Sequence, residues 1–184
     1  MDLAWPSAAL LPSYVDALHR GWSPDTQRPD ATYDELARIE SDPLQFILEQ
    51  VDVEGRGPAI TLPDGSVVPR LPGYKRWLWD GEFCGVISLR WQPGTTALPP
   101  TCLGHIGYSV VSWKQRRGYA TRALALLFPE LRALDLPYVE LTTDAANIAS
   151  QRVIEVNGGV FVESFRKPAS HGGTLSKRYR IVVP

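Results

Sequence analysis

One turn in this chain, at residues 115–121, joins a segment with the composition of a strand to a segment with the periodicity of a helix. The segment before it, 104–111, is rich in β-branched and aromatic residues, and after it leucine recurs at helical spacing from Leu124 to Leu134. A glycine-containing turn that opens a helix leaves backbone N–H groups unpaired, with the positive end of the helix dipole behind them. This junction therefore predicts a site for an anion such as a pyrophosphate.

The side chains around the turn agree with this prediction. Lys114, Arg116, Arg117 and Arg122 lie in the stretch 105–129, which contains no Asp or Glu. The chain has neither the Gly-x-x-x-x-Gly-Lys-Ser/Thr of a P-loop nor the Gly-x-Gly-x-x-Gly of a dinucleotide-binding fold. The alternative interpretation is a solvated basic helix start with a turn glycine.

Two blocks together resemble the GNAT N-acetyltransferase superfamily. Gln115, Gly118 and Ala120 match its acetyl-CoA loop, Gln/Arg-x-x-Gly-x-Gly/Ala. Residues 147–159 look like its second block, in which an Asn opens a helix that ends in Asn-Gly before a strand. The resemblance covers roughly residues 104–165.

The resemblance implies an α/β fold. It predicts a mixed, mostly antiparallel twisted sheet of about seven strands flanked by about four helices, with a splay between strands 4 and 5. Pro129 is expected to kink or end its helix early. The expected elements are strands at 2–5, 74–79, 83–91, 104–111, 137–143, 160–166 and 175–183, helices at 11–22, 32–53 (interrupted at Pro43), 119 onward and 147 onward, and loops at 55–73 and 93–100. Between 74–79 and 83–91, Asp80–Gly81 is a strong signal for a two-residue hairpin turn, so these strands are expected to be antiparallel neighbours.

Length and composition favour a single domain over residues 1–184. Within it, the resemblance implies substrate-side helices in 1–60 and an acetyl-CoA-binding core in 104–165. A chain of 184 residues with 44% hydrophobic content can bury one substantial core. Its two cysteines show no metal spacing and no disulfide framework, and no segment has the length or composition of a signal peptide or a membrane span. We expect a cytoplasmic protein without a metal and without a membrane partner.

The charge is unevenly distributed. Residues 1–60 hold 4 basic and 11 acidic side chains, whereas residues 61–184 hold 15 basic and 9 acidic ones. A positive second part fits an anionic nucleotide cofactor, and an acidic first part favours a cationic substrate such as an amine. The alternative is that the acidic residues only solvate helix faces and caps. This distribution argues against a nucleic-acid partner.

The resemblance also implies roles for individual residues. Val110 and Val111 would lie at a bulge of the fourth strand, where backbone groups pair with the pantetheine arm and the Val111 N–H polarises the thioester carbonyl. The implied cofactor-binding residues are Val110, Val111, Gln115, Arg116, Arg117, Gly118, Tyr119, Ala120, Thr121, Asn147, Ser150 and Arg152.

Acetyl transfer needs a neutral amine, so a base must take a proton from the ammonium form. His105 is the first candidate, because period-two alternation places it on the same strand face as Val111. The alternative is a hydrogen-bonded structural histidine. Glu82 and Glu140 are weaker candidates and possible substrate-binding carboxylates, although each is expected to be solvated or paired.

The sequence departs from the family at one position. Many members place a tyrosine seven residues after the Asn to protonate the departing thiolate, but here that position is Ile154. Ser150, Tyr108 or water are the alternative donors. A covalent intermediate on Cys84 or Cys102 is discounted, since neither has a sequence neighbour that would lower its pKa.

These observations predict an acetyl-CoA-dependent N-acetyltransferase that acts directly, in a ternary complex, on a primary amine of a small molecule. One alternative is a non-catalytic acyl-CoA sensor module. Another is an acetyltransferase acting on a protein N-terminus, a lysine or an aminoacyl-tRNA. A homodimer is possible.

Overall fold

The computed structural model describes residues 1–183 except 26, 27, 29 and 63. The strands are β1 (Asp2–Ala4), β2 (Val51–Asp52), β3 (Ile60–Thr61), β4 (Val67–Val68), β5 (Gly73–Trp79), β6 (Phe83–Arg90), β7 (Ile106–Val110), β8 (Tyr138–Asp144), β9 (Val160–Arg166) and β10 (Leu175–Val182). The α-helices are α1 (Leu11–His19), α2 (Ala31–Ser41), α3 (Pro43–Leu48), α4 (Tyr119–Ala133) and α5 (Ile148–Val156), and Ser112–Lys114 and Ala169–His171 form short 3-10 turns.

Two antiparallel sheets form the centre of the molecule. In the first, the order is β1-β5-β6-β7, with β2 also paired to β5, and in the second it is β8-β10-β9. The small β3–β4 hairpin falls in the segment expected to be loop. The strong turn signal at Asp80–Gly81 is confirmed, because it joins β5 and β6 in an antiparallel pair.

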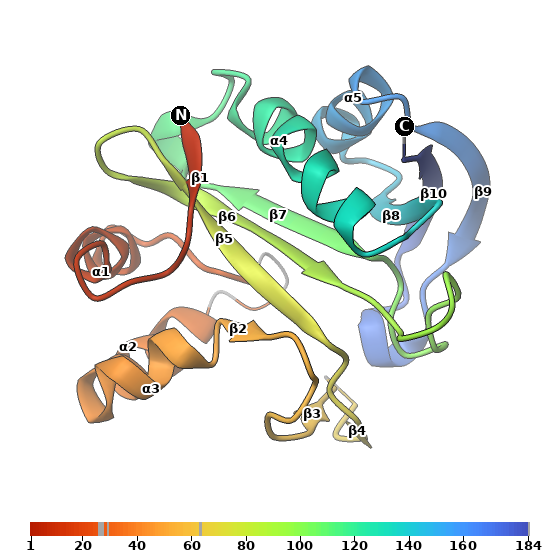
Figure 1. The fold of residues 1–184 in the computed structure, drawn as a ribbon. Helices are drawn as coiled ribbons and strands as arrows, with labels where there is room; N and C mark the ends of the chain where they lie inside the picture. The colour runs from red at the N-terminus through yellow and green to blue at the C-terminus, as the bar shows by residue number, and fades with distance from the viewer. Residues whose placement is uncertain (26–27, 29, 63, 184) are drawn as a thin grey trace.

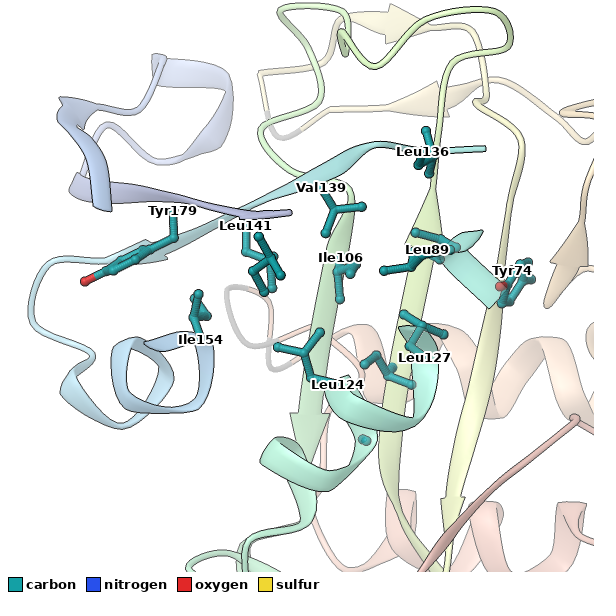
Figure 2. Packing of buried hydrophobic residues seen from close by; sticks show 14 of the residues in the cluster. Tyr74, Leu89, Ile106, Leu124, Leu127, Leu136, Val139, Leu141, Ile154 and Tyr179 are labelled. Carbon is teal, nitrogen blue, oxygen red and sulfur yellow. The ribbon is translucent and has the colours of Figure 1, made fainter. Parts of the chain in front are cut away.

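Helices cover both faces of the first sheet. Helices α1–α3 lie on one face and α4 lies on the other, with α5 beside α4 and against β8 of the second sheet (Figure 1). Figure 2 shows Leu124 and Leu127 of α4 directed at Leu89 and Ile106 of the sheet, and Ile154 of α5 near Leu141 of β8. A second apolar cluster, which includes Trp22, Trp77, Phe83 and Val111, packs under α1–α3. Each face of the sheet is therefore buried by its own group of helices.

The two prolines expected to interrupt helices behave differently. Asp42 and Pro43 do separate α2 from α3, and the Asp42 carboxylate caps α3 by accepting the Gln45 N–H at 2.9 Å. The expectation that Pro129 ends its helix is wrong, since α4 continues to Ala133. The apolar side chains of α4, including the fully buried Leu127 and Leu131, hold it against the sheet on both sides of the proline.

Candidate active site

The two sheets diverge where β7 and β8 meet. β7 is the last strand of its sheet and β8 is the first of the other. They are joined at one end, where the His105 N–H donates to the Glu140 carbonyl at 2.7 Å and the Glu140 N–H donates to His105 Nδ1 at 3.0 Å. Along the rest of β7, the edge that faces β8 has no strand partner among the described residues. This divergence, the splay, matches the one expected between the fourth and fifth long strands.

The backbone groups that face the splay can be identified from the ladder. The Val111 N–H donates to the Cys84 carbonyl at 3.0 Å, so it faces β6. In an antiparallel strand, successive residues direct their backbone groups to opposite edges, so the N–H of Val110 faces the splay. The Val110 carbonyl agrees with this orientation, because it accepts the Gln115 Nε2 amide at 3.2 Å.

This geometry corrects two expectations about β7. The register between β6 and β7 is continuous from Gly85 to Leu89, so no bulge opens the strand. The Val111 N–H is already bonded within the sheet and is not free to polarise a thioester. The free donor in this pair is Val110, and the divergence of two sheets, rather than a bulge, exposes it.

The predicted anion loop follows β7 directly. Arg116 and Gly118 both adopt left-handed conformations, with φ of 60° and 74°, and the turn leads into α4 without a side-chain cap. The first backbone bond of the helix runs from the Arg122 N–H to Gly118, and no acceptor within the described residues takes the N–H groups of 119–121. Alternating left-handed residues and a free helix start form the concave array of N–H groups that binds anions.

Some basic side chains in and around the loop are free of ion pairs with described residues, and others are paired with carboxylates. Arg116 and Arg117 are exposed and have no carboxylate partner within the described residues, so they are available to a phosphate. Arg122 pairs with Asp2 at 3.2 Å. Lys114 is buried between Asp80 and Glu82, at 2.9 and 2.6 Å, and is therefore a structural cation rather than part of the anion site.

Asp80 is a residue that the sequence analysis interpreted only as a turn signal. Its carboxylate binds Lys114 at one end of the loop and the Tyr119 hydroxyl, at 2.5 Å, at the other. Burial opposes its ionisation, but the hydrogen bonds from Tyr119 and Lys114 prevail and hold the pKa of Asp80 well below its usual range. The tip of the β5–β6 hairpin thus braces both ends of the anion loop.

The two candidate proton donors come together across the gap between β7 and α5. The Tyr108 hydroxyl lies 2.8 Å from Ser150 Oγ and 3.3 Å from the Ser150 carbonyl. Burial raises the pKa of Tyr108 to about 12, so this hydroxyl keeps its proton at neutral pH. Asn147 caps α5 by accepting the Ser150 N–H at 3.0 Å, and Ile154 is buried in the core.

The geometry at His105 does not support a role as general base. The side chain is only 1% exposed, and burial is the main cause that lowers its pKa, so the ring is neutral at pH 7. Because Nδ1 accepts the Glu140 N–H, the neutral ring carries its hydrogen on Nε2 and has no free lone pair for an amine. His105 instead fixes the end of the splay.

The two carboxylates proposed for the substrate are engaged elsewhere. Glu82 pairs with Lys114, and Glu140 binds both Arg178 and Arg180, at 2.9 and 2.7 Å. Arg152 is exposed and pairs with Glu155 at 3.2 Å. None of these side chains lines the large hollow described next.

A hollow of about 510 Å³ lies against the face of β5–β7 that α1–α3 cover, and it reaches Thr142 of β8 beside the splay. Sequence analysis missed the side chains that give it chemical character. The titratable residues of its lining are Glu49, Asp52, Arg70, Tyr74, Lys75, Arg90, Cys102, Lys167 and His171. Alternation in a strand shows which residues share a face, but not which face borders a cavity, so no sequence signal identified them.

Comparison with known families settles what kind of protein carries this site. Residues 16–160 match the model of the acetyltransferase (GNAT) domain. The chain belongs to this family. Acetyl-CoA is the acetyl donor of GNAT enzymes, and the free N–H groups of the splay and anion loop fit it. No curated protein matches the chain by sequence.

Solved GNAT structures share the fold over nearly the whole chain. The microcin self-immunity acetyltransferase MccE, in complex with acetyl-CoA and AMP, is 13% identical with a TM-score of 0.61, covering 98% of this chain and 91% of that one. RimL, a ribosomal alpha-N-protein acetyltransferase in complex with coenzyme A, is 13% identical with a TM-score of 0.62, covering 98% and 93%. An acetyl transferase from Salmonella typhimurium that modifies the N-terminal serine of a ribosomal protein is 15% identical with a TM-score of 0.61, covering 99% and 94%.

The described residues offer no metal site, no membrane-spanning helix and no activated thiol at Cys84. They contain no group of three or more His, Cys, Asp or Glu side chains placed to hold a metal ion. No helix in the described ranges is long and apolar enough to cross a membrane. Burial raises the pKa of the Cys84 thiol to about 12, which disfavours the thiolate that a covalent intermediate would need.

Proposed function

We propose that this protein is an N-acetyltransferase that transfers an acetyl group directly to the primary amine of a small molecule. The observation that carries the proposal is the continuity of three features: the open edge of β7, the anion loop that follows it, and the hollow beside it. Bound acetyl-CoA supplies an acetyl thioester, whose C–S bond breaks as the acceptor nitrogen forms a C–N bond.

Binding of the donor is assigned to two backbone arrays. The N–H of Val110 donates to the thioester oxygen, a contribution of about 3 kcal/mol for one oxyanion donor. The N–H groups of 119–121 and the side chains of Arg116 and Arg117 take the pyrophosphate. Asn147 and Ser150 contact the pantetheine arm from the start of α5.

Proton transfer is assigned to residues on the two sides of the splay. The Tyr108 hydroxyl, paired with Ser150, donates a proton to the leaving thiolate. The proton of the attacking amine goes to His171, the imidazole that lines the hollow, whose Nδ1 is 3.1 Å from Ser170 Oγ. These assignments replace the tyrosine that the family places at the position of Ile154, and they replace His105 as base.

Calorimetry with acetyl-CoA tests the binding part with a matched pair of variants. Gly118 and Gly94 have nearly equal φ, +74° and +75°, and at neither residue does any atom lie within 4 Å of the position that a Cβ would occupy. We expect Gly118→Trp to weaken acetyl-CoA binding at least about tenfold, because the side chain fills the anion site. Gly94→Trp should change it by less than about twofold, since this glycine lies in the 93–100 loop. Equal binding by both variants would contradict the proposed site.

Thiol release tests the reaction. With an amine panel of amino acids, aminoalkyl phosphates, polyamines and short peptides, at least one small amine should release coenzyme A, and Tyr108→Phe should lower kcat about 10²-fold without weakening acetyl-CoA binding. Acetyl-CoA binding without release from any amine would favour the sensor alternative. A protein N-terminus is the second candidate acceptor, because RimL and the Salmonella typhimurium protein act on ribosomal proteins; preference for peptides over every small amine would select it.

A further inference from the structure

The floor of the hollow is a row of three residues across neighbouring strands. The ladders pair Lys75 of β5 with Ser88 of β6, and Ser88 with Gly107 of β7. All three residues line the hollow. Because Gly107 has no side chain, the floor is lowest beside the splay. An acceptor bound there would lie next to the strand that faces the thioester.

Arg90 reaches back over this row. Its Nη2 donates to Ser88 Oγ at 2.7 Å, and it lies 3.4 Å from the position that a Cβ on Gly107 would occupy. Within the described residues, no carboxylate lies within ion-pair distance of Arg90. A partly buried guanidinium without a counter-charge is costly, and it is the side chain best shaped to bind a carboxylate or a phosphate through two hydrogen bonds.

Two other cations of the hollow, Lys75 and Arg70, are only partly compensated. Lys75 has one ion pair, with Glu35 at 3.8 Å, although Glu35 also accepts the Tyr14 hydroxyl. Arg70 is 3.8 Å from Asp52. Burial, together with the neighbouring cations Arg38, Arg90 and Arg70, lowers the pKa of Lys75 despite Glu35. An anion in the hollow would relieve this repulsion.

The acidic residues of the hollow do not supply that anion. Asp52 accepts the N–H groups of Arg56 and Gly57, each at 2.9 Å, and Glu49 binds Arg38 and the Gln45 amide. Lys167 is paired with Asp144 at 2.6 Å. The carboxylates of the hollow thus have partners of their own, and the floor beside the splay is positive.

We propose that the hollow is the acceptor site and that the acceptor carries, besides its amine, a carboxylate or phosphate that binds Arg90 and Lys75. This inference rests on the proposed N-acetyltransferase function and narrows its substrate class to anionic amines, such as amino acids or aminoalkyl phosphates. Polyamines and aminoglycosides are excluded, because their added positive charges would face Arg90 and Lys75. The anion would hold the molecule over Gly107, with its amine directed to the splay.

Matched acceptors test the charge requirement. Thiol release is measured for each amino acid against its amide, and for O-phosphoethanolamine against ethanolamine, so the carboxylate and phosphate sources are separate arms. We expect the anionic member of at least one pair to have kcat/KM at least about tenfold higher than its neutral counterpart. Amides or polyamines used as well as the acids would overturn the inference.

Variants locate the anion. Arg90→Gln should raise KM for the anionic acceptor at least about tenfold and leave KM for acetyl-CoA within about twofold. Arg90→Lys keeps the positive charge but cannot form two parallel hydrogen bonds to the anion, so its KM for the acceptor should lie between those of the wild type and Arg90→Gln. The control is Arg56→Gln, because Arg56 is 80% exposed and lies outside the hollow. The melting temperature of each variant reports whether it folds.

The outcomes separate the two proposals. Release from a neutral or polycationic amine at a rate that Arg90→Gln does not change would overturn the anion site and leave the enzyme assignment standing. Acetyl-CoA binding with no release from any acceptor would overturn the proposed function, and the acceptor class with it. Calorimetry can measure the binding of inorganic phosphate to the wild type and to Arg90→Gln, which gives a readout independent of turnover. This binding should be lost in the variant.

Discussion

The close approach of β6 to β7 gives a quantitative test of what positions the open edge. A Cβ at Gly85 would lie 2.2 Å from the Ser109 carbonyl oxygen and 2.9 Å from Val110 Cα, separations that Cβ atoms do not tolerate. Gly85→Ala must therefore push β7 away by on the order of 1 Å, because the packed interior has no room to absorb the methyl group. Overpacking costs about 1–3 kcal/mol. The φ of +147° adds about 1–2 kcal/mol of strain for a residue with a Cβ.

Gly81→Ala separates these two costs. Gly81 also has a positive φ, +108°, but nothing lies within 4 Å of its Cβ position. Urea unfolding, followed by the fluorescence of the six tryptophans, should show a loss of about 2–5 kcal/mol for Gly85→Ala and about 1–2 kcal/mol for Gly81→Ala.

The same displacement should appear in catalysis. A shift of about 1 Å in β7, the strand proposed to bind the thioester, should lower kcat/KM about 10²-fold in Gly85→Ala, while Gly81→Ala retains most of its activity. The reasoning is refuted if the two variants have equal unfolding free energies and equal kcat/KM. The splay would then be positioned by something other than the contact of Gly85 with β7.

Two further predictions concern titratable residues. Asp80→Asn should lower the free energy of unfolding at neutral pH by about 1–3 kcal/mol. The pKa of Asp80 is depressed in the fold, so the carboxylate contributes its full stability above the unfolded pKa of about 3.9 and loses that contribution as the pH falls below this value. In urea unfolding, the difference between wild type and Asp80→Asn should therefore shrink at pH values below about 3.9. The control is Glu82→Gln, whose side chain is 48% exposed, and it should lower the free energy of unfolding by less than about 1 kcal/mol. If the difference in unfolding free energy between wild type and Asp80→Asn does not change with pH, the bracing role is contradicted. In steady-state kinetics, His171→Asn should lower kcat about 10²-fold and leave KM for acetyl-CoA within about twofold, whereas His105→Asn should lower kcat less; the reverse result would restore His105 as the base.

The features predicted correctly from sequence are those with local causes. The β5–β6 hairpin needs only the Asp80–Gly81 turn between two strand-forming runs, and the turn that opens α4 needs only Gly118 between a strand-forming and a helix-forming run. Pro43 breaks a helix at a point where Asp42 caps the next one. In each case the residues that decide the structure are neighbours in the chain.

The features that sequence analysis placed wrongly depend on a partner strand. Alternation in β7 shows that Val110 and Val111 face opposite edges, but only the bond from Val111 to Cys84 shows which edge is open. If the assignment of edges is shifted by one residue, the Val111 N–H is taken as the free donor and the Val110 N–H as the bonded one. In the same way, His105 is an ordinary strand histidine in the sequence, and it loses its free lone pair only because β8 places the Glu140 N–H against Nδ1.

The charge of the hollow shows why the balance of a segment does not predict the charge of a site. Residues 1–60 are strongly acidic, yet Glu35 binds Tyr14 and Lys75, Glu49 binds Arg38, and Asp42 caps α3. These carboxylates form ion pairs or cap helices within the fold, so they are not available to bind a ligand. A ligand interacts with the charged groups that have no ion-pair partner in the described part of the fold. On the floor of the hollow, that group is the Arg90 guanidinium. An acidic N-terminal segment is therefore compatible with an anionic acceptor, and the proposed sign of the substrate rests on a guanidinium without a counter-charge among the described residues rather than on the net charge of the helices above it.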